Sequence, residues 1–241
     1  MTIDHAIDTP WSDRLKAVQQ RIELAARAVG RSPDEIRLLA VSKTFPADAV
    51  AQVHAAGQLA FGENYIQEGI DKIAALQSVR GELEWHCIGP IQSNKTRWVA
   101  EHFDWVQTVD RLKIAQRLND QRPAEMAPLN VLIQVNIDSG ATKSGVSPNE
   151  AEALAQALMR LPRLRLRGLM CIPDPQPDWQ AQCAVFRQAR DLFDGWRAQG
   201  WAIDTVSMGM SADLEAAVAS GSTMVRIGSA LFGQRSYSSA V

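Results

Sequence analysis

The sequence has few of the residues from which metal sites and disulfide frameworks are built. Its 241 residues include three cysteines, Cys87, Cys171 and Cys183, and four histidines. The number of cysteines is odd, no Cys-x-x-Cys pair occurs, and no two histidines have the spacing of metal ligands. We therefore expect neither a metal site nor a disulfide, which is usual in a reducing, cytoplasmic compartment.

An excess of positive charge and a long apolar segment are also missing. Lysine and arginine number 25 against 27 acidic residues, which leaves a formal net charge of -2 and no sign of a basic, nucleic-acid-binding surface. No apolar run is long enough to span a bilayer, and the N-terminal segment MTIDHAIDTPWSDRLK lacks the apolar core of a signal peptide. These absences predict a cytoplasmic protein that binds neither nucleic acid nor membranes. A monomer or weak dimer is expected, although nothing in the composition determines the oligomeric state.

What the sequence does contain is a regular alternation of short apolar runs and amphipathic segments. Residues 11–29 have apolar side chains at helical spacing. Eight apolar runs follow, at residues 36–42, 58–62, 84–89, 103–109, 129–137, 164–172, 202–209 and 223–230. Helices are expected between them, at residues 46–56, 64–79, 94–102, 111–122, 148–160, 178–199 and 212–220.

Strands that are apolar on both faces and separated by helices indicate a parallel sheet. Eight such units predict an α/β fold, a single (β/α)8 TIM barrel with an extra N-terminal helix; a doubly wound open sheet is the alternative. The hydrophobic content of 46% is enough for one large core, so a single domain is expected. Its predicted parts are an N-terminal helix and lead-in (1–35), the barrel (36–233) and a tail (234–241).

In a barrel of this kind, functional side chains gather where the strands end. The last two strands end in the segments VSMGMSADLEAAV, which contains Ser207 and Gly209, and VRIGSALFG, which contains Arg226, Gly228 and Ser229. Hydroxyl groups, backbone N–H groups and an arginine together hold a phosphate dianion well. The two segments therefore predict a phosphate site, although glycine and serine also make ordinary turns.

The first strand ends on a lysine without a neighbouring carboxylate, in the segment LLAVSKTFPA. In a partly apolar site a lysine loses its proton more easily, and the neutral amine can attack an aldehyde to form a Schiff base. Because the first and eighth strands of a closed barrel are neighbours, Lys43 would lie beside the phosphate site. An aldehyde and a phosphate on one small ligand indicate pyridoxal 5'-phosphate (PLP). The alternative is a lysine that only extends its charge into solvent.

Three other polar residues stand at predicted strand ends. Asn64 is uncharged and could hydrogen-bond a phenolic oxygen. Glu63 could be a base, but an ion pair with a neighbour is the preferred interpretation. His86 is interpreted as a hydrogen-bonded histidine of the strand end rather than a ligand contact.

Six segments, in order from about residue 36 to residue 233, resemble the signatures of the pyridoxal-phosphate homeostasis protein family. They are LLAVSKTFPA, FGENYIQE, WHCIGPIQSNK, KSGV, LRGLMCIP and SMGMSADLEAAVASGSTMVRIGSALFG. The resemblance implies a PLP-binding barrel related to the N-terminal domain of alanine racemase. One departure is Phe45, where many members of the family have a lysine, and it should remove a charge from the mouth of the site.

The resemblance also implies roles for individual residues. Lys43 would form the covalent aldimine with PLP, Asn64 would lie beside the ring, and Met170 would line the pocket. The phosphate would be held by Ser207, Gly209, Arg226, Gly228 and Ser229, largely through hydroxyl and backbone N–H groups. Arg226 could instead reach the pyridine nitrogen.

Two functions are compatible with such a site. The resemblance implies a carrier that stores PLP and passes it to PLP-dependent apoenzymes, with no catalytic residues of its own. A PLP-dependent amino-acid racemase is the alternative, and it needs acid–base groups on both faces of the cofactor. The sequence has two tyrosines, Tyr65 and Tyr237, and it ends at LFGQRSYSSAV without room for the second domain of a racemase, which favours the carrier. A third alternative is a sugar-phosphate enzyme that uses Lys43 as an aldolase does.

Overall fold

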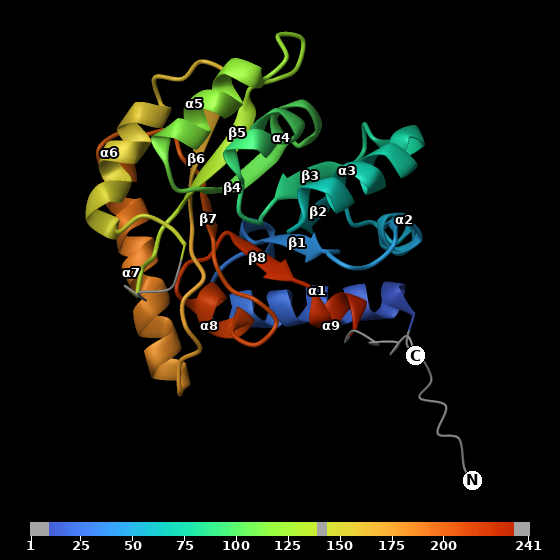
Figure 1. Cartoon of the computed structure of the whole chain (residues 1–241). Coiled ribbons are helices and arrows are strands. Elements are labelled where there is room, and N and C mark those ends of the chain that lie inside the picture. Colours follow the sequence, from blue (N-terminus) through green and yellow to red (C-terminus); the bar gives the residue numbers. More distant parts are fainter. Residues whose placement is uncertain (1–9, 139–143, 234–241) are drawn as a thin grey trace, which may run out of the picture.

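The computed structural model describes residues 10–138 and 144–233, and in them eight parallel strands close into a barrel (Figure 1). The strands are β1 (Arg37–Val41), β2 (Ala60–Glu63), β3 (Glu84–Cys87), β4 (Trp105–Val109), β5 (Leu129–Gln134), β6 (Leu164–Met170), β7 (Thr205–Ser207) and β8 (Met224–Ile227). They pair in sequence order, and β8 pairs with β1. The predicted (β/α)8 barrel is confirmed, and the open sheet is excluded.

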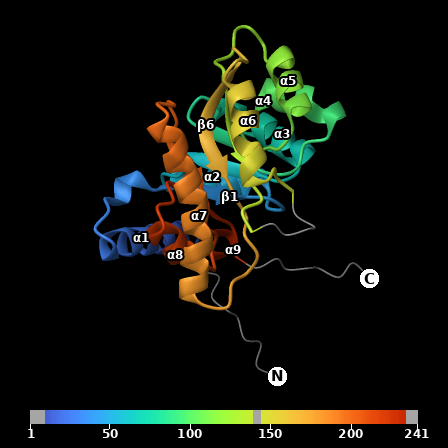
Figure 2. The same ribbon diagram turned by 90° about the vertical axis from the view of Figure 1, so that its left-hand side faces the viewer.

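Helices surround the barrel. They are α1 (Trp11–Ala28), α2 (Ala47–Ala55), α3 (Ile66–Ala75), α4 (Thr96–His102), α5 (Leu112–Gln121), α6 (Pro148–Leu158), α7 (Trp179–Ala198), α8 (Leu214–Ala219) and α9 (Ser229–Phe232). Short 3-10 turns occur as η1 (Pro33–Glu35), η2 (Gln77–Val79) and η3 (Ser93–Lys95). Figure 2 shows α6 and α7 on the outside of the sheet, where both pack against β6.

Most strands are shorter than the apolar runs that predicted them. The run 202–209 contains only the three-residue strand β7, and beyond its carboxyl end Gly209 has a φ of 96°, a left-handed conformation that an extended strand does not contain. Apolar character therefore continues past the strands into the loops at their carboxyl ends. The predicted tail (234–241) lies outside the described residues, and the division of the chain into lead-in, barrel and tail stays a prediction.

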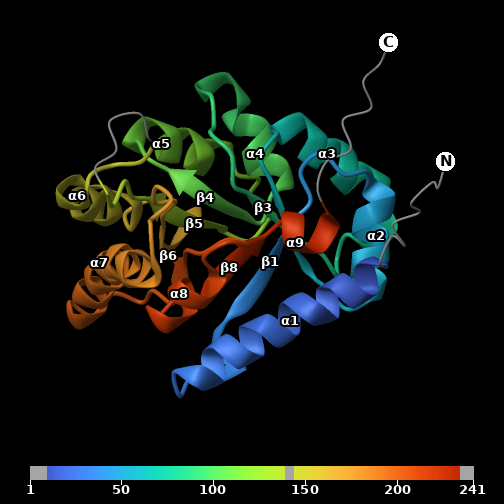
Figure 3. The same cartoon turned by 90° about the horizontal axis from the view of Figure 1, so that it is seen from below.

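The N-terminal helix α1 covers the barrel where the last helix is too short to do so. Helix α9 has four residues, whereas α1 has 18 and packs against α8, α9 and α2. Figure 3 shows α1 lying across β8 and β1. Leu15, Val18 and Ile22 on one face of α1 are buried. Burying this apolar face completes the ring of helices and shields the seam at which the barrel closes.

The core has two parts. Large side chains such as Phe61, Trp85 and Phe193 fill the layer between strands and helices. Inside the barrel lie smaller apolar groups, one around Leu39 and Met224 and one formed by Trp105, Leu132 and Met170. Buried polar side chains share that interior: His86, Gln107, Ser207 and Arg226. No helix in the described part of the chain is long and apolar enough to cross a membrane.

Candidate functional site

A cavity of about 780 Å³ opens at the carboxyl ends of the strands. Five of the eight predicted site residues line it: Lys43, Asn64, Arg226, Gly228 and Ser229. They come from the ends of β1, β2 and β8, which lie side by side because β8 closes onto β1. Ser211, from the loop after β7, also lines the cavity.

The other three predicted residues lie beside the lining rather than in it. Met170 is fully buried inside the barrel. Ser207 is fully buried at the end of β7. Gly209 accepts a hydrogen bond on its carbonyl from the N–H of Arg226, at 3.0 Å. An added Cβ at Gly209 would lie 2.5 Å from the Cβ of Ala217, so this glycine allows α8 to approach the end of β7 closely.

Lys43 is half-buried at the cavity wall, and its ammonium group has no hydrogen-bond or ion-pair partner in the described part of the chain. The next residue, Thr44, has a φ of 69°, which is unusual for a β-branched side chain. Phe45 stacks on Phe232 with 5.2 Å between ring centroids. The turn therefore holds an unpaired amine at the cavity, and the apolar ring of Phe45 packs beside it.

A buried ion cluster fixes both neighbours of Lys43. The Nζ atom of Lys72 donates hydrogen bonds of 2.7 Å to the Ser42 carbonyl, to Glu63 and to Glu68. The Ser42 hydroxyl donates to Glu63 at 2.6 Å, and the Thr44 N–H donates to Glu68. Burial raises the pKa of Glu63, although the charge and hydrogen bond of Lys72 oppose the shift. The interpretation of Glu63 as an ion-pair partner is confirmed.

Arg226 is a buried cation surrounded by neutral acceptors. Its side chain is almost completely buried, and its guanidinium donates to the Ser207 carbonyl at 2.7 Å, to the Ser207 hydroxyl at 2.8 Å and to the Cys171 carbonyl at 2.9 Å. Burial lowers the pKa of this arginine, but a guanidinium keeps its proton in proteins. Because the bonded partners carry no negative charge, the cavity beside Arg226 is suited to an anion or a strong acceptor.

A line of hydrogen bonds continues from Ser207 through the barrel. The Ser207 hydroxyl donates to Gln107 Oε1 at 2.7 Å, Gln107 Nε2 lies 2.9 Å from His86 Nδ1, and His86 Nε2 lies 2.7 Å from Glu84. Glu84 forms an ion pair with Arg37 at 2.7 Å. A neutral His86 with its proton on Nε2 satisfies every contact. Sequence reasoning assigned Gln107 no role, because no local pattern marks an inward-facing amide.

The burial and hydrogen bonds of His86 and Glu84 determine how these two residues make stability depend on pH. Burial lowers the pKa of His86 below 6.5, whereas Glu84, despite burial, is held ionised by the hydrogen bond from His86 and the charge of Arg37, with a pKa of about 2. Below pH 6.5 the unfolded chain thus takes up a proton that folded His86 does not, and stability falls as the pH falls.

We therefore expect the urea midpoint of the protein to decrease from about pH 7.5 to about pH 5.5, and to decrease less in His86→Gln. Glutamine keeps donor and acceptor groups but cannot titrate. His102→Gln, which changes a half-buried histidine of α4, is the matched control and should keep the wild-type slope. Equal slopes in wild type and His86→Gln would contradict the neutral assignment.

Backbone N–H groups converge on one wall of the cavity. Those of Ser211, Ala212, Gly228 and Ser229 donate no hydrogen bond within the described part of the chain. The Ser229 hydroxyl lies 3.3 Å from the Ser211 hydroxyl, so two hydroxyl groups stand at the same wall. Unpaired N–H groups and hydroxyls at adjacent strand ends form a cradle for a phosphate group.

Asn64 presents an unpartnered amide to the same cavity. Its Oδ1 atom is buried and has no hydrogen-bond partner. The backbone of Asn64 is held by close contact with Gly89, where an added Cβ would lie 1.9 Å from the Asn64 carbonyl oxygen. A buried amide oxygen without a partner is costly in a folded protein, and a ligand with a hydrogen-bond donor at this wall would remove that cost.

The cysteines offer no competing chemistry. Cys87, Cys171 and Cys183 are buried and form no disulfide. Burial raises the pKa of the Cys87 thiol to about 12, which removes it as a nucleophile at neutral pH. In residues 10–138 and 144–233 there is no cluster of three or more side chains able to hold a metal ion.

Comparisons with known proteins agree with this geometry. The family model described as "Alanine racemase, N-terminal domain" matches residues 14–236. The pyridoxal phosphate homeostasis proteins of Escherichia coli K12 and of Pseudomonas aeruginosa PAO1 are 59% and 55% identical over 226 residues, which cover 93% and 94% of this chain and 96% of each relative.

Solved structures show the same barrel. PipY of Synechococcus elongatus PCC7942, solved with PLP bound, matches with a TM-score of 0.81 and 35% identity, over 92% of this chain and 100% of PipY. An alanine racemase of Clostridium difficile 630 matches with a TM-score of 0.73 and 18% identity over 57% of its length, which shows the fold alone. The chain therefore belongs to the pyridoxal phosphate homeostasis protein family, within the larger group that shares the alanine racemase N-terminal domain.

Proposed function

We propose that this protein binds PLP reversibly through Lys43 and acts as a store and carrier of the cofactor in the cytoplasm. The observation that carries the proposal is the shared cavity, in which an unpaired amine faces a cradle of unpaired N–H and hydroxyl groups. When bound, PLP supplies an aldehyde for a covalent bond to an amine and a phosphate for anchoring. The names of the relatives and the PLP bound to PipY support the same ligand.

The residues of the cavity would divide the work of binding. Gly228, Ser229 and Ser211 would hold the phosphate, and the Asn64 amide would hydrogen-bond the phenolic oxygen of the ring. Arg226 would reach the ring nitrogen or the phosphate from the cavity floor. Ser207 and Gly209 would act through Arg226, which both of them contact, and Met170 would shape the interior below.

The cavity supports a carrier better than a racemase. Among its described lining residues, only Lys43 and Arg226 have ionisable side chains, and a guanidinium keeps its proton, which leaves Lys43 as the one candidate acid–base group. Tyr65 is 56% exposed and is not part of the lining, and Tyr237 lies outside the described residues. A racemase needs a second acid–base group on the other face of the cofactor. Hand-over to PLP-dependent apoenzymes would follow from a site that is open to solvent.

The test is reconstitution of the purified protein with PLP. We expect an absorption band in the visible region that disappears on borohydride reduction, with the pyridoxyl mass on the peptide containing Lys43. A protein that stays colourless after reconstitution would overturn the proposal. Amino-acid racemisation measured on the loaded protein separates the two functions, since turnover well above that of free PLP would make it an enzyme.

Replacement of Arg226 by alanine should weaken PLP binding about tenfold to a hundredfold, because hydrogen bonds to charged groups contribute about 1.5–3 kcal/mol. The dissociation constant is measured by titration with PLP. Arg160→Ala, which removes an exposed arginine in the turn after α6, serves as the control for the loss of one charge. An unchanged constant in Arg226→Ala would place this arginine outside the binding site.

A further inference from the structure

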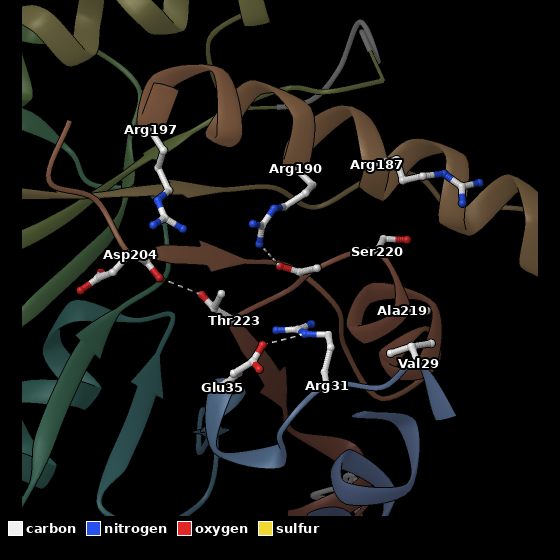
Figure 4. A pocket seen from close by; sticks show the side chains of 11 residues that line it. Val29, Arg31, Glu35, Arg187, Arg190, Arg197, Asp204, Ala219, Ser220 and Thr223 are labelled. Carbon is white, nitrogen blue, oxygen red and sulfur yellow. Dashed lines mark hydrogen bonds and ion pairs between the residues drawn. The ribbon is translucent and has the colours of Figure 1, made fainter. Parts of the chain in front are cut away.

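A second cavity, of about 600 Å³, lies at the opposite end of the barrel (Figure 4). It is lined by residues that precede β1, β7 and β8, whereas Lys43 and its neighbours follow the strands. Helix α7 supplies Arg187, Arg190 and Arg197, and the segment before β1 supplies Arg31. We call this cavity the arginine pocket.

The arginine pocket carries more positive than negative charge. Its four arginines face two carboxylates, Glu35 and Asp204. Asp204 is already neutralised by a two-pronged ion pair with Arg167, at 2.9 Å and 2.6 Å. The whole chain has a formal net charge of -2, so the gathering of arginines in one pocket does not reflect a basic protein. Arg31 and Arg190 are in turn paired with Glu35 at 3.1 Å and with Asp194 at 2.8 Å, which leaves Arg187 and Arg197 without a carboxylate partner in the described part of the chain.

Two of the guanidinium groups are held in place by neutral carbonyl groups. Arg31 donates to the Val218 carbonyl at 2.8 Å and to Glu35 at 3.1 Å. Arg190 donates to the Gly221 carbonyl at 3.0 Å and, along its own helix, to Asp194 at 2.8 Å. The carbonyl groups fix each guanidinium, and one terminal nitrogen, Nη2, of each has no bond in the described part of the chain. Fixed, unfilled donors of this kind lower the ordering cost of binding a ligand.

Arg197, an exposed residue of α7, supplies the third guanidinium of the pocket. Figure 4 shows Arg197 and Arg190 directed from α7 into the pocket and Arg31 approaching from the other side, while Arg187 points aside. Arg197 makes no hydrogen bond or ion pair within residues 10–138 and 144–233. Arg31 and Arg190 have a structural role, because they donate to the carbonyl groups of Val218 and Gly221 at the end of α8. No such contact accounts for Arg197.

We propose that the arginine pocket binds the phosphate group of a small anionic molecule through Arg31, Arg190 and Arg197. Guanidinium groups match the oxygens of a phosphate, and several of them around one point are the usual arrangement for a dianion. The volume of about 600 Å³ is that of a site for a small metabolite, so a phosphate monoester fits the pocket better than an extended polymer.

The test is calorimetric titration of the full chain with inorganic phosphate and with adenosine 5'-monophosphate, at constant ionic strength set by chloride. Arg197→Gln should weaken binding of phosphate at this pocket about tenfold or more, because it removes a charged hydrogen-bonding group. Arg160→Gln, the matched loss of one exposed arginine, should leave the affinity unchanged.

Phosphate can also enter the cofactor cradle, so the two sites are told apart by which variant changes the affinity. The proposal predicts a binding event that is weakened tenfold or more in Arg197→Gln and keeps its affinity in Arg226→Ala, whether or not the protein binds PLP. Tighter binding of adenosine 5'-monophosphate than of phosphate would assign an organic phosphate as the ligand, and equal binding would assign the free anion. The proposal would be overturned if the affinity for phosphate were unchanged in Arg197→Gln. It would also be overturned if the pocket bound only a single-stranded RNA oligonucleotide.

Discussion

Lys43→Ala will abolish the covalent adduct between this protein and PLP while leaving weaker, non-covalent binding. Alanine removes the amine that forms the bond to the aldehyde. The unpaired N–H groups of Gly228 and Ser229 and the buried guanidinium of Arg226 do not depend on Lys43 and should still hold the phosphate and the ring. The variant should fold normally, because Lys43 makes no hydrogen bond or ion pair in the described part of the chain.

The measurement is mass spectrometry after borohydride reduction, together with the visible spectrum. Wild type should gain one pyridoxyl group, and Lys43→Ala should gain none. Lys113→Ala, which removes an exposed lysine of α5, is the matched control and should react as wild type does. A stoichiometric adduct in Lys43→Ala would show that another amine carries the cofactor, and loss of both covalent and non-covalent binding would make Lys43 a structural residue.

The fold could be predicted from the sequence because its pattern is local and repeated. Each apolar run lies between helical segments, and eight repeats of one unit leave few ways to bury all the strands. The closed order of the strands then placed Lys43 next to Arg226, although the two residues are far apart in the chain. Strand lengths were overestimated where apolar residues such as Met208 continue past the end of a strand, since burial alone does not distinguish a strand from a buried loop.

The parts of the site that could not be predicted depend on contacts between distant residues. Ser207 and Gln107 are 100 positions apart, and their hydrogen bond follows only from the direction in which β4 and β7 present their side chains inside the barrel. The arginine pocket likewise combines α7 with the segment before β1. Lys72 lies on α3 and offers no sequence signal for its bond to the Ser42 carbonyl. Such contacts require the register and rotation of each element, which apolar periodicity does not determine.

The cluster beneath Lys43 should make Lys72→Met the most destabilising of the substitutions considered. The Lys72 side chain is 5% exposed and that of Glu63 is completely buried, so methionine would leave a buried carboxylate with only the Ser42 hydroxyl as partner. Removing one member of a buried ion pair costs about 3–5 kcal/mol. The same change frees the Ser42 carbonyl, so the turn that carries Lys43 should loosen and the covalent adduct should form more slowly.

The stability lost in Lys72→Met should increase as the pH rises. Burial already raises the pKa of Glu63 above 4.5, and removing Lys72 raises it further. Between pH 4.5 and the raised pKa, folded Glu63 holds a proton that the unfolded chain has released, so stability falls as the pH rises. Urea unfolding should therefore show a larger deficit for Lys72→Met at about pH 8 than at about pH 5.5.

A second substitution shows whether the unpaired charge causes the loss. Glu63→Gln combined with Lys72→Met replaces both charges with neutral groups of similar size and should recover much of the stability at high pH, because replacing both members of a buried ion pair is often nearly neutral. Lys113→Met controls for the substitution on an exposed helix surface. If Lys72→Met costs less than about 1 kcal/mol at every pH, or if the double variant is no more stable than the single one, the cluster does not support the turn electrostatically. Recovery of stability without recovery of the adduct rate would instead show that Lys72 positions Lys43 through the Ser42 carbonyl.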